Sequence, residues 1–265
     1  MEQEHAPKYP VQTLEKALEI LSLLSGKSKN TKEGGGFGIS EISASLNMGK
    51  STVHRILNTL MEYQYVERCE NSTRYRLGMG VFKVGNAALA QHTISLADFT
   101  PLDELCTAYN EAVNVGVRTK NKVTIIYKCE AEMTLQVKRQ IGETEPLHTT
   151  AMGKVLICEL PEQQVRELFA ATEMRLYTAK TISSVESLLP VLQRVRQQGY
   201  AMDEEEYCLG LTCLACPVRD YSGKIVAAMS VSGPSVRMTF NRVAALKEDL
   251  QKVSMKISKQ LGYNR

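Results

Sequence analysis

The 265-residue chain lacks any apolar run that approaches the roughly 20 residues that a membrane-spanning helix needs. Residues 1–5 are polar and acidic and no apolar segment follows them, so the sequence predicts no secretory signal. The seven cysteines are odd in number and spread along the chain, which favours a reducing compartment over a disulfide framework. We therefore expect a soluble, cytoplasmic protein with no membrane partner.

A large excess of charge of one sign is also absent, because the formal net charge is only +3. Residues 27–76 contain eight basic and five acidic residues, so this segment accounts for the whole surplus. Any affinity for nucleic acid must therefore come from a few well-placed cations and from dimerisation, not from a basic tail. The 43% of hydrophobic residues is enough for two compact domains.

Residues 39–57 have the pattern of two short helices joined by a tight turn, which is typical of a helix-turn-helix. Ser40 can cap the first helix with its hydroxyl, and Asn47 and Gly49 have the chemistry of a turn. Apolar residues recur at helical spacing along one face of the second helix: Val53, Ile56, Leu57 and Leu60. This second helix is therefore expected to pack one face inward and to present the other to solvent.

The outer face of the second helix carries side chains that can hydrogen-bond phosphates and base edges: Lys50, Ser51, Thr52, His54, Arg55, Asn58 and Thr59. We expect the first five of these to approach a major groove, with Arg55 contacting a base. Two strand-like runs around a polar turn at residues 69–73 predict a wing after the helix pair. Alternation along the second run puts Arg74 and Arg76 on one face, where they are expected to meet phosphates.

Several segments resemble the IclR family of bacterial transcriptional regulators. Three of them resemble its DNA-binding domain: residues 50–57, 66–68 and 75–78. Three more resemble its effector domain in order and spacing: residues 146–154, 199–205 and 230–234. The resemblance implies a ligand-responsive DNA-binding transcription regulator, a repressor more often than an activator, and not an enzyme. It also implies a homodimer, or a dimer of dimers, on a palindromic double-stranded DNA operator.

Mixed helical and strand patterns along the chain predict an α+β fold. Helices are expected at residues 12–24, 81–90, 94–109 with a new start at Pro101, 151–160, 161–170 and 185–198, and from 240 after a Thr239 cap. Strands are expected at residues 113–118, 123–129, 133–139, 200–203, 212–219 and 224–232. Residues 26–38 are rich in glycine and lysine and read as a mobile loop.

The chain is accordingly divided into three parts. Residues 1–79 form the winged helix-turn-helix DNA-binding domain, residues 80–95 a linker helix, and residues 96–265 an effector-binding and oligomerisation domain. The resemblance implies that this last domain is GAF-like, with a central antiparallel sheet. Its small-molecule effector is expected to enter there and to change the affinity for DNA.

The resemblance implies an effector site made by six residues: Ala151, Met152, Asp203, Cys213, Ser230 and Ser232. Residues 149–154 lie where a loop enters a helix, whose free N–H groups attract an anion. Ser230 and Ser232 share a strand face and offer two hydroxyl donors. These donors suit the carboxylate of a small hydroxy- or keto-acid, and Asp203 would accept from a ligand hydroxyl. Family members also bind aromatics and sugar acids, so the ligand class stays open.

Cys213 leaves three other chemistries to be weighed. With Cys216 it has the spacing of a zinc knuckle, although on a strand the two would point to opposite faces. Its thiol becomes redox-sensitive if a cation or a helix start lowers its pKa. With His148 and Asp203 it has the residue types of a cysteine enzyme. We expect none of these to apply, and therefore no metal or cofactor.

Overall fold

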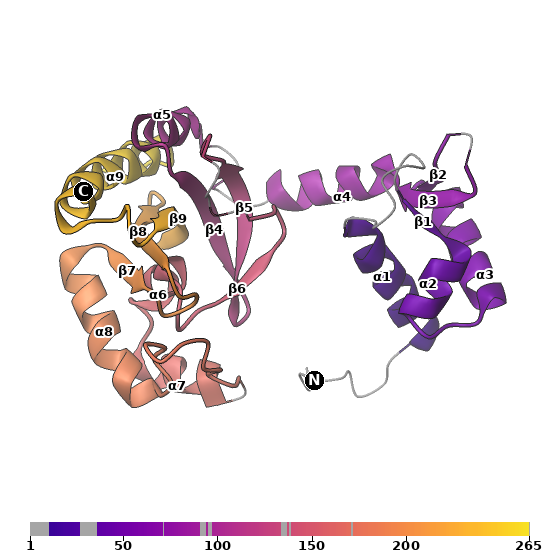
Figure 1. Cartoon of the computed structure of the whole chain (residues 1–265), viewed down its shortest axis with the longest axis horizontal. Helices are drawn as coiled ribbons and strands as arrows, with labels where there is room; N and C mark the ends of the chain where they lie inside the picture. Colours follow the sequence, from indigo (N-terminus) through magenta and orange to yellow (C-terminus); the bar gives the residue numbers. More distant parts are fainter. Residues whose placement is uncertain are drawn as a thin grey trace. The chain divides into compact units, whose positions relative to one another are not determined.

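The computed structural model describes residues 11–26, 36–70, 72–90, 94, 97–133, 137, 139–170 and 172–264. The chain divides into two compact units, Met1–His92 and Thr93–Arg265 (Figure 1). The α+β architecture is confirmed, with a winged helix-turn-helix in the first unit and an antiparallel sheet with helices in the second. Among the described helices, none combines the length and apolarity that a membrane crossing requires.

The N-terminal unit follows the predicted order of helices and wing strands. Its elements are α1 (Gln12–Ser25), β1 (Phe37–Gly38), α2 (Ile39–Ser45), α3 (Lys50–Glu62), β2 (Val66–Arg68), β3 (Arg74–Leu77) and α4 (Met79–Ala90). β3 is the central strand of a three-stranded sheet with the order β1-β3-β2. The loop predicted at residues 26–38 lies mostly outside the described residues, and its last two residues form β1, which we did not predict.

The turn between α2 and α3 forms as its residues predict. Asn47 has a φ of 49°, a left-handed conformation that asparagine tolerates better than most residues. Gly49 precedes the first residue of α3. The predicted Ser40 cap is wrong, because α2 already begins at Ile39 and the Gly38 N–H donates to Glu41 Oε2 at 2.9 Å. Both helices pack on a core shared with α1 and β3: Ile20, Leu24, Ile42, Met48, Val53, Ile56, Leu57, Val66 and Tyr75.

The C-terminal unit is an antiparallel sheet with the strand order β6-β5-β4-β9-β8-β7. Its strands are β4 (Ala112–Thr119), β5 (Lys122–Cys129), β6 (Thr144–Pro146), β7 (Ala201–Glu204), β8 (Leu211–Arg219) and β9 (Ile225–Pro234). Its helices are α5 (Thr100–Tyr109), α6 (Ala151–Ile157), α7 (Glu162–Ala170), α8 (Val185–Gln198) and α9 (Phe240–Gln260). Figure 1 shows α5 and α9 together on one side of this unit and α7 and α8 on another, and two separate apolar cores fill the space between sheet and helices.

Three predictions in this unit need correction. The helix expected from residue 94 begins only at Thr100, with Pro101 in its first turn. The strand expected at residues 133–139 lies partly outside the described residues, and its described members are not in a strand. The short strand β6 takes its place in the sheet and pairs with β5. Thr239 does precede α9, but its side chain makes no capping hydrogen bond.

The strand register brings distant polar residues together. Asp203 on β7 lies opposite Cys213 on β8, which in turn lies opposite Ser232 on β9. Two residues earlier on β9, Ser230 lies opposite Asn114 on β4. Because side chains alternate along a strand, these residues share the sheet face on which α6 packs.

Candidate functional site

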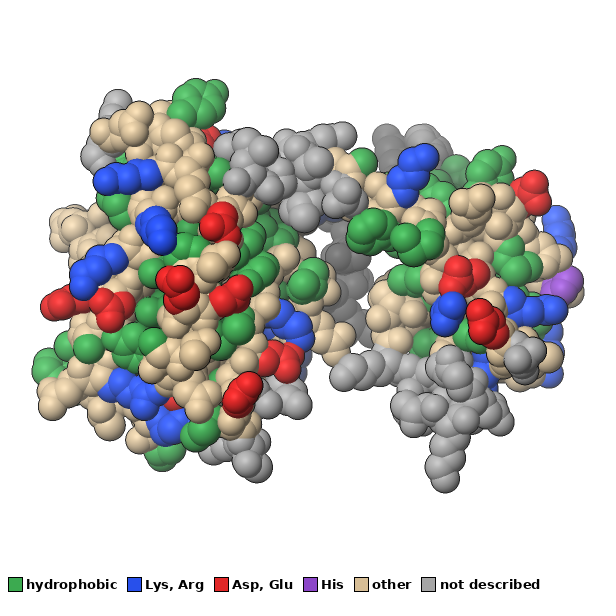
Figure 2. All heavy atoms as spheres, turned by 90° about the horizontal axis from the view of Figure 1, so that it is seen from above, with side chains coloured by type: hydrophobic (Ala, Val, Ile, Leu, Met, Phe, Trp, Pro, Cys, Tyr) green, Lys and Arg blue, Asp and Glu red, His purple; other side chains and the backbone are tan. Residues whose placement is uncertain are grey.

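α3 exposes the polar face that the sequence predicts. Lys50, Ser51, His54 and Arg55 are exposed and Thr52 is half-buried, while the apolar face is buried in the unit's core. In Figure 2 the surface of the N-terminal unit carries basic side chains and a histidine near one another. A protruding helix with cationic and hydroxyl side chains is the feature that helix-turn-helix proteins place in a major groove.

The two wing arginines differ from each other, and the prediction for Arg74 is wrong. Its side chain is buried, and its guanidinium donates to the Gly36 carbonyl oxygen at 2.9 and 3.1 Å and to Glu41 Oε2 at 2.6 Å. Strand alternation puts Arg74 on the face away from the core, but its guanidinium is bonded there to the Gly36 carbonyl before β1 and to Glu41 of α2. Arg76 is exposed as predicted, with an ion pair to Glu67 across the wing.

In the C-terminal unit a cavity lies between α6 and the sheet. All six residues that the sequence analysis named for the effector line it: Ala151, Met152, Asp203, Cys213, Ser230 and Ser232. Five further lining residues were missed: Asn114, Arg139, Glu145, Thr150 and Tyr207. The cavity has a volume of about 10 Å³, which is about the room that one water molecule needs. An organic ligand must therefore displace lining side chains when it enters.

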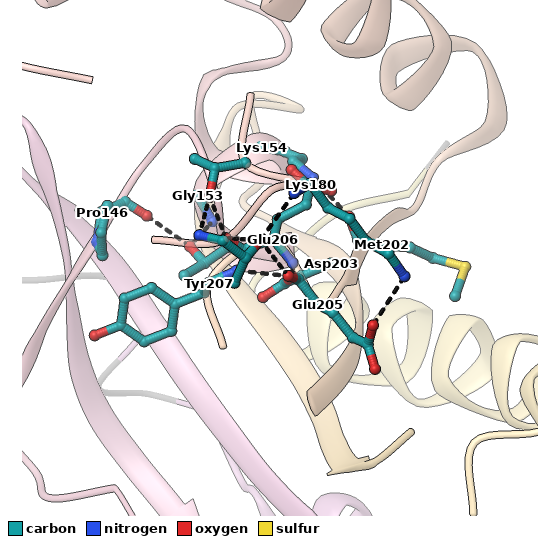
Figure 3. Close-up of polar contacts among 12 residues, drawn as sticks. Pro146, Gly153, Lys154, Lys180, Met202, Asp203, Glu205, Glu206 and Tyr207 are labelled. Atoms are coloured by element: carbon teal, nitrogen blue, oxygen red, sulfur yellow. Dashed lines mark hydrogen bonds and ion pairs between the residues drawn. The ribbon is translucent and has the colours of Figure 1, made fainter. Parts of the chain in front are cut away.

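The start of α6 is held tightly against the preceding loop. The Thr150 hydroxyl accepts from the Gly153 N–H at 3.1 Å and donates to the Pro146 carbonyl at 2.8 Å (Figure 3). A Cβ on Gly153 would lie 2.4 Å from the Leu147 carbonyl oxygen, so only glycine fits there. α6 has just seven residues, and a helix dipole sums over its peptide units, so this helix attracts an anion less than expected.

Asp203 is a buried carboxyl group in the lining of the cavity. Its Oδ1 accepts from the backbone N–H groups of Glu206 at 2.8 Å and Tyr207 at 3.3 Å. Its Oδ2 is buried and has no hydrogen-bond partner among the described residues, and the same holds for the Ser230 hydroxyl oxygen. Burial raises the pKa of Asp203 to about 7, although the two N–H donors and the charge of Lys154 oppose that rise. This carboxyl can therefore carry a proton near neutral pH.

The neighbouring charges form two pairs, and Figure 3 shows the first of them, Lys154 with Glu206. Lys154, which is buried, donates to the Met202 carbonyl at 2.8 Å and forms an ion pair with Glu206. Arg139 pairs with the buried Glu145, and its guanidinium carbon lies 5.5 Å from the centre of the Tyr207 ring. Burial raises the pKa of Glu145, and Arg139 opposes this rise. Arg139 thus brings a cation to the cavity wall.

The geometry argues against the three alternatives for Cys213, namely a zinc site, a redox-sensitive thiol and a cysteine enzyme. Cys213 and Cys216 belong to the apolar cores on opposite faces of the sheet, so they cannot ligate one metal ion. Burial raises the pKa of the Cys213 thiol above its usual range and that of Cys216 to about 12, which suppresses the reactive thiolate. His148 does not line the cavity, and its Nε2 lies 3.1 Å from the Arg175 carbonyl oxygen.

A winged helix-turn-helix unit joined in one chain to a unit with an enclosed polar cavity defines the class of ligand-responsive transcription regulators. Comparisons with known proteins give the family. Residues 13–69 match the IclR helix-turn-helix domain, and residues 86–259 match the bacterial transcriptional regulator IclR C-terminal domain. The chain belongs to the IclR family of bacterial transcription regulators, which are not enzymes.

Individual relatives agree with this assignment. The chain is 35% identical over 227 residues to the HTH-type transcriptional regulator KdgR of Escherichia coli, a match that covers 86% of each protein. It is 32% identical over 251 residues to the HTH-type transcriptional repressor AllR of Salmonella typhi, covering 95% of this chain and 90% of AllR. The crystal structure of the Thermotoga maritima IclR matches with a TM-score of 0.78 and 28% identity, over 96% of this chain and 100% of that one.

Proposed function

We propose that this chain is a cytoplasmic transcriptional repressor that releases its operator when a small organic acid binds the cavity under α6. Residues 1–79 would bind DNA, residues 80–95 would link the domains, and residues 96–265 would bind the effector and oligomerise. The repressor assignment draws support from AllR, a relative that is named as a repressor.

The DNA contacts are proposed from the exposed face of α3 and from the wing. Lys50, Ser51, Thr52, His54 and Arg55 would lie at the major groove, with Arg55 reading a base. Arg76 would give up its ion pair with Glu67 and contact a DNA phosphate instead. Arg74 is not included, because its guanidinium is bonded within the domain.

A homodimer on a palindromic operator is proposed from exposed apolar side chains of the N-terminal unit. On α1, Leu14 and Leu18 lie one turn apart and are each 57% exposed. On α4, Met79 and Phe82 are 66% and 63% exposed. Apolar faces of this kind mark contacts with another protein surface, and a second copy of the chain would give the two-fold symmetry that a palindrome requires.

The effector assignment depends above all on one observation. Asp203 and Ser230 line the same cavity, and within the described part of the chain Asp203 Oδ2 and Ser230 Oγ are buried without hydrogen-bond partners. The polar side chains of Ser232, Asn114 and Arg139 line the cavity with them. Leaving a buried polar atom unpaired costs about 1–3 kcal/mol, so such a cavity favours a ligand rich in oxygen atoms. A small hydroxy- or keto-acid meets this requirement.

The test selects genomic fragments with purified protein at moderate salt, with Arg55→Ala in parallel. We expect the native protein to recover fragments that share a palindrome, and the variant to lose or relax that preference. A reporter driven by a recovered fragment then separates repression from activation. Salt-sensitive binding that is indifferent to sequence would contradict the proposed reading of α3.

A further inference from the structure

The cavity contains two buried oxygen atoms that differ in what they can offer a ligand. The Ser230 hydroxyl can donate, whereas Asp203 Oδ2 can only accept as long as the carboxyl is ionised. Both residues are almost fully buried, at 2% and 1% exposure, and neither atom has a hydrogen-bond partner in the described part of the chain. A ligand that bonds to both atoms must offer an acceptor to the Ser230 hydroxyl and a suitable partner to Asp203 Oδ2.

The carboxylate group of a ligand, unlike a hydroxyl group, can match the pair in only one protonation state of Asp203. Its two oxygens accept hydrogen bonds and donate none. Ser230 can donate to one of these oxygens, but an ionised Asp203 would set its own negative oxygen against the other in a site with little room for water. If Asp203 Oδ2 carries a proton, it donates to the second ligand oxygen and the repulsion disappears.

We propose that a small carboxylic acid binds here as its anion and that Asp203 takes up one proton from the solvent in the same step. The proton bonds to Asp203 Oδ2, which then donates to one carboxylate oxygen while the Ser230 hydroxyl donates to the other. No bond of the ligand is made or broken. This inference rests on the proposed function, since it concerns the same cavity and the same class of effector.

The surroundings of Asp203 single it out among the buried carboxyl groups of the unit. Charged and titratable groups approach it from each packed element: Lys154 of α6, Glu206 and Tyr207 after β7, Cys213 of β8, Glu145 of β6 and Arg139 before it. Glu206 is paired with Lys154, and Glu145 is paired with Arg139. Among the described residues no cationic side chain is hydrogen-bonded to Asp203.

Each paired carboxylate has a cation within bonding distance that favours its ionised form. Asp203 has instead two backbone N–H donors, and both of them serve Oδ1. Oδ2 is thus the oxygen left without a partner in the described part of the chain, and a proton on it would find the ligand as its acceptor. The position of the Asp203 pKa, raised by burial to about 7, makes this uptake accessible at physiological pH.

The test is isothermal titration of the full chain with lactate, pyruvate and gluconate at pH 6 and pH 8. Each titration is repeated in two buffers that differ in ionisation enthalpy, because the difference in heat counts the protons taken up. For an acid that binds, we expect uptake near one proton at pH 8, little uptake at pH 6, and affinity about tenfold weaker at pH 8. Binding at pH 8 without proton uptake would overturn the inference and leave the effector site itself intact.

Two variants identify the group that takes up the proton. Asp203→Asn donates through its amide without titrating, so it should bind the acid with no uptake and with equal affinity at both pH values. Glu145→Gln is the matched control, which removes another buried carboxyl of the same cavity, and uptake should persist in it. Uptake that persists in Asp203→Asn, or that disappears in Glu145→Gln, would contradict the assignment to Asp203.

Lactamide provides a measurement that does not depend on the folding of a variant. Its amide N–H can donate to ionised Asp203 while its carbonyl accepts from Ser230, so it should bind the wild-type chain without proton uptake at pH 8. Equal uptake with lactate and lactamide would overturn the inference. If none of the three acids binds at either pH, both this inference and the proposed effector class fail.

Discussion

Arg74 and Arg76 stand two residues apart on β3, and we predict opposite consequences when each is replaced by methionine. Arg74 makes hydrogen bonds to the Gly36 carbonyl and an ion pair to Glu41, which joins β3 to β1 and to the start of α2. Methionine keeps an unbranched apolar stem but removes the guanidinium and these bonds. Arg76 is exposed and its partner Glu67 is also exposed, so its loss should change the free energy of unfolding little.

The loss of stability expected for Arg74→Met follows from the contacts of the Arg74 side chain. Hydrogen bonds to a charged group contribute about 1.5–3 kcal/mol. Because the Glu41 side chain is 46% exposed, its ion pair is screened by solvent and adds little more. We therefore expect Arg74→Met to reduce the stability of the N-terminal unit by about 2–3 kcal/mol, which corresponds to roughly 30- to 150-fold faster amide exchange in the wing and in α2.

Two assays on the full chain separate the roles. Hydrogen exchange followed by mass spectrometry over residues 36–77 measures stability, and operator binding as a function of salt measures phosphate contacts. Arg76→Met should weaken all DNA sequences alike and reduce the salt slope by about 1, with unchanged exchange. The prediction for Arg74 is refuted if Arg74→Met leaves amide exchange unchanged and lowers the salt slope of operator binding as Arg76→Met does.

Three further predictions concern single positions. Arg55→Ala should cost about 1–3 kcal/mol of binding to the selected palindrome and much less to unrelated DNA, as measured by competition binding; an equal loss on both would contradict base contact. Gly153→Ala should destabilise the C-terminal unit by about 1–3 kcal/mol in urea unfolding, because its Cβ would overlap the Leu147 backbone; unchanged stability would show that α6 can shift. Asp203 has a raised pKa when folded, so the folded chain binds more protons than the unfolded one between about pH 4 and pH 7, and stability should fall as the pH rises through this range. Over that pH range the unfolding free energy of the wild type should therefore fall by up to roughly 4 kcal/mol relative to that of Asp203→Asn. Parallel curves of stability against pH for the two proteins would disprove this prediction.

The helix-turn-helix could be predicted because its signals are local. The 3.6-residue pattern of α3 and the turn residues Asn47 and Gly49 each act over a few positions. The error at Arg74 has a non-local cause. Alternation assigns a strand residue to a face, but the Arg74 guanidinium is bonded to the Gly36 carbonyl and to Glu41, which are distant in the sequence. β1, formed by Phe37 and Gly38, brings this segment beside β3, and two residues in a glycine-rich segment carry no strand pattern of their own.

The cavity could be predicted only in part, and for a similar reason. Resemblance to the family supplied the six residues, the strand register explains why the four on strands meet, and α6 packs on the same sheet face with the other two. Asn114 had a signal that went unused, since it is a polar residue within an apolar strand. Arg139 was expected at the end of a strand but lies outside any helix or strand, so the strand pattern did not point to its place in the cavity wall. Its place beside Glu145 depends on how the chain folds between β5 and β6.

We propose that an acid in the cavity under α6 controls DNA binding at α3. The most direct test measures operator affinity with and without the acid that binds in calorimetry, for wild type and for Ser230→Ala. We predict that the acid changes the operator affinity of wild type at least tenfold, a coupling of about 1.4 kcal/mol, and that Ser230→Ala binds the operator normally but does not respond. An equal response in both proteins would contradict the account, because the effector would then act from another site.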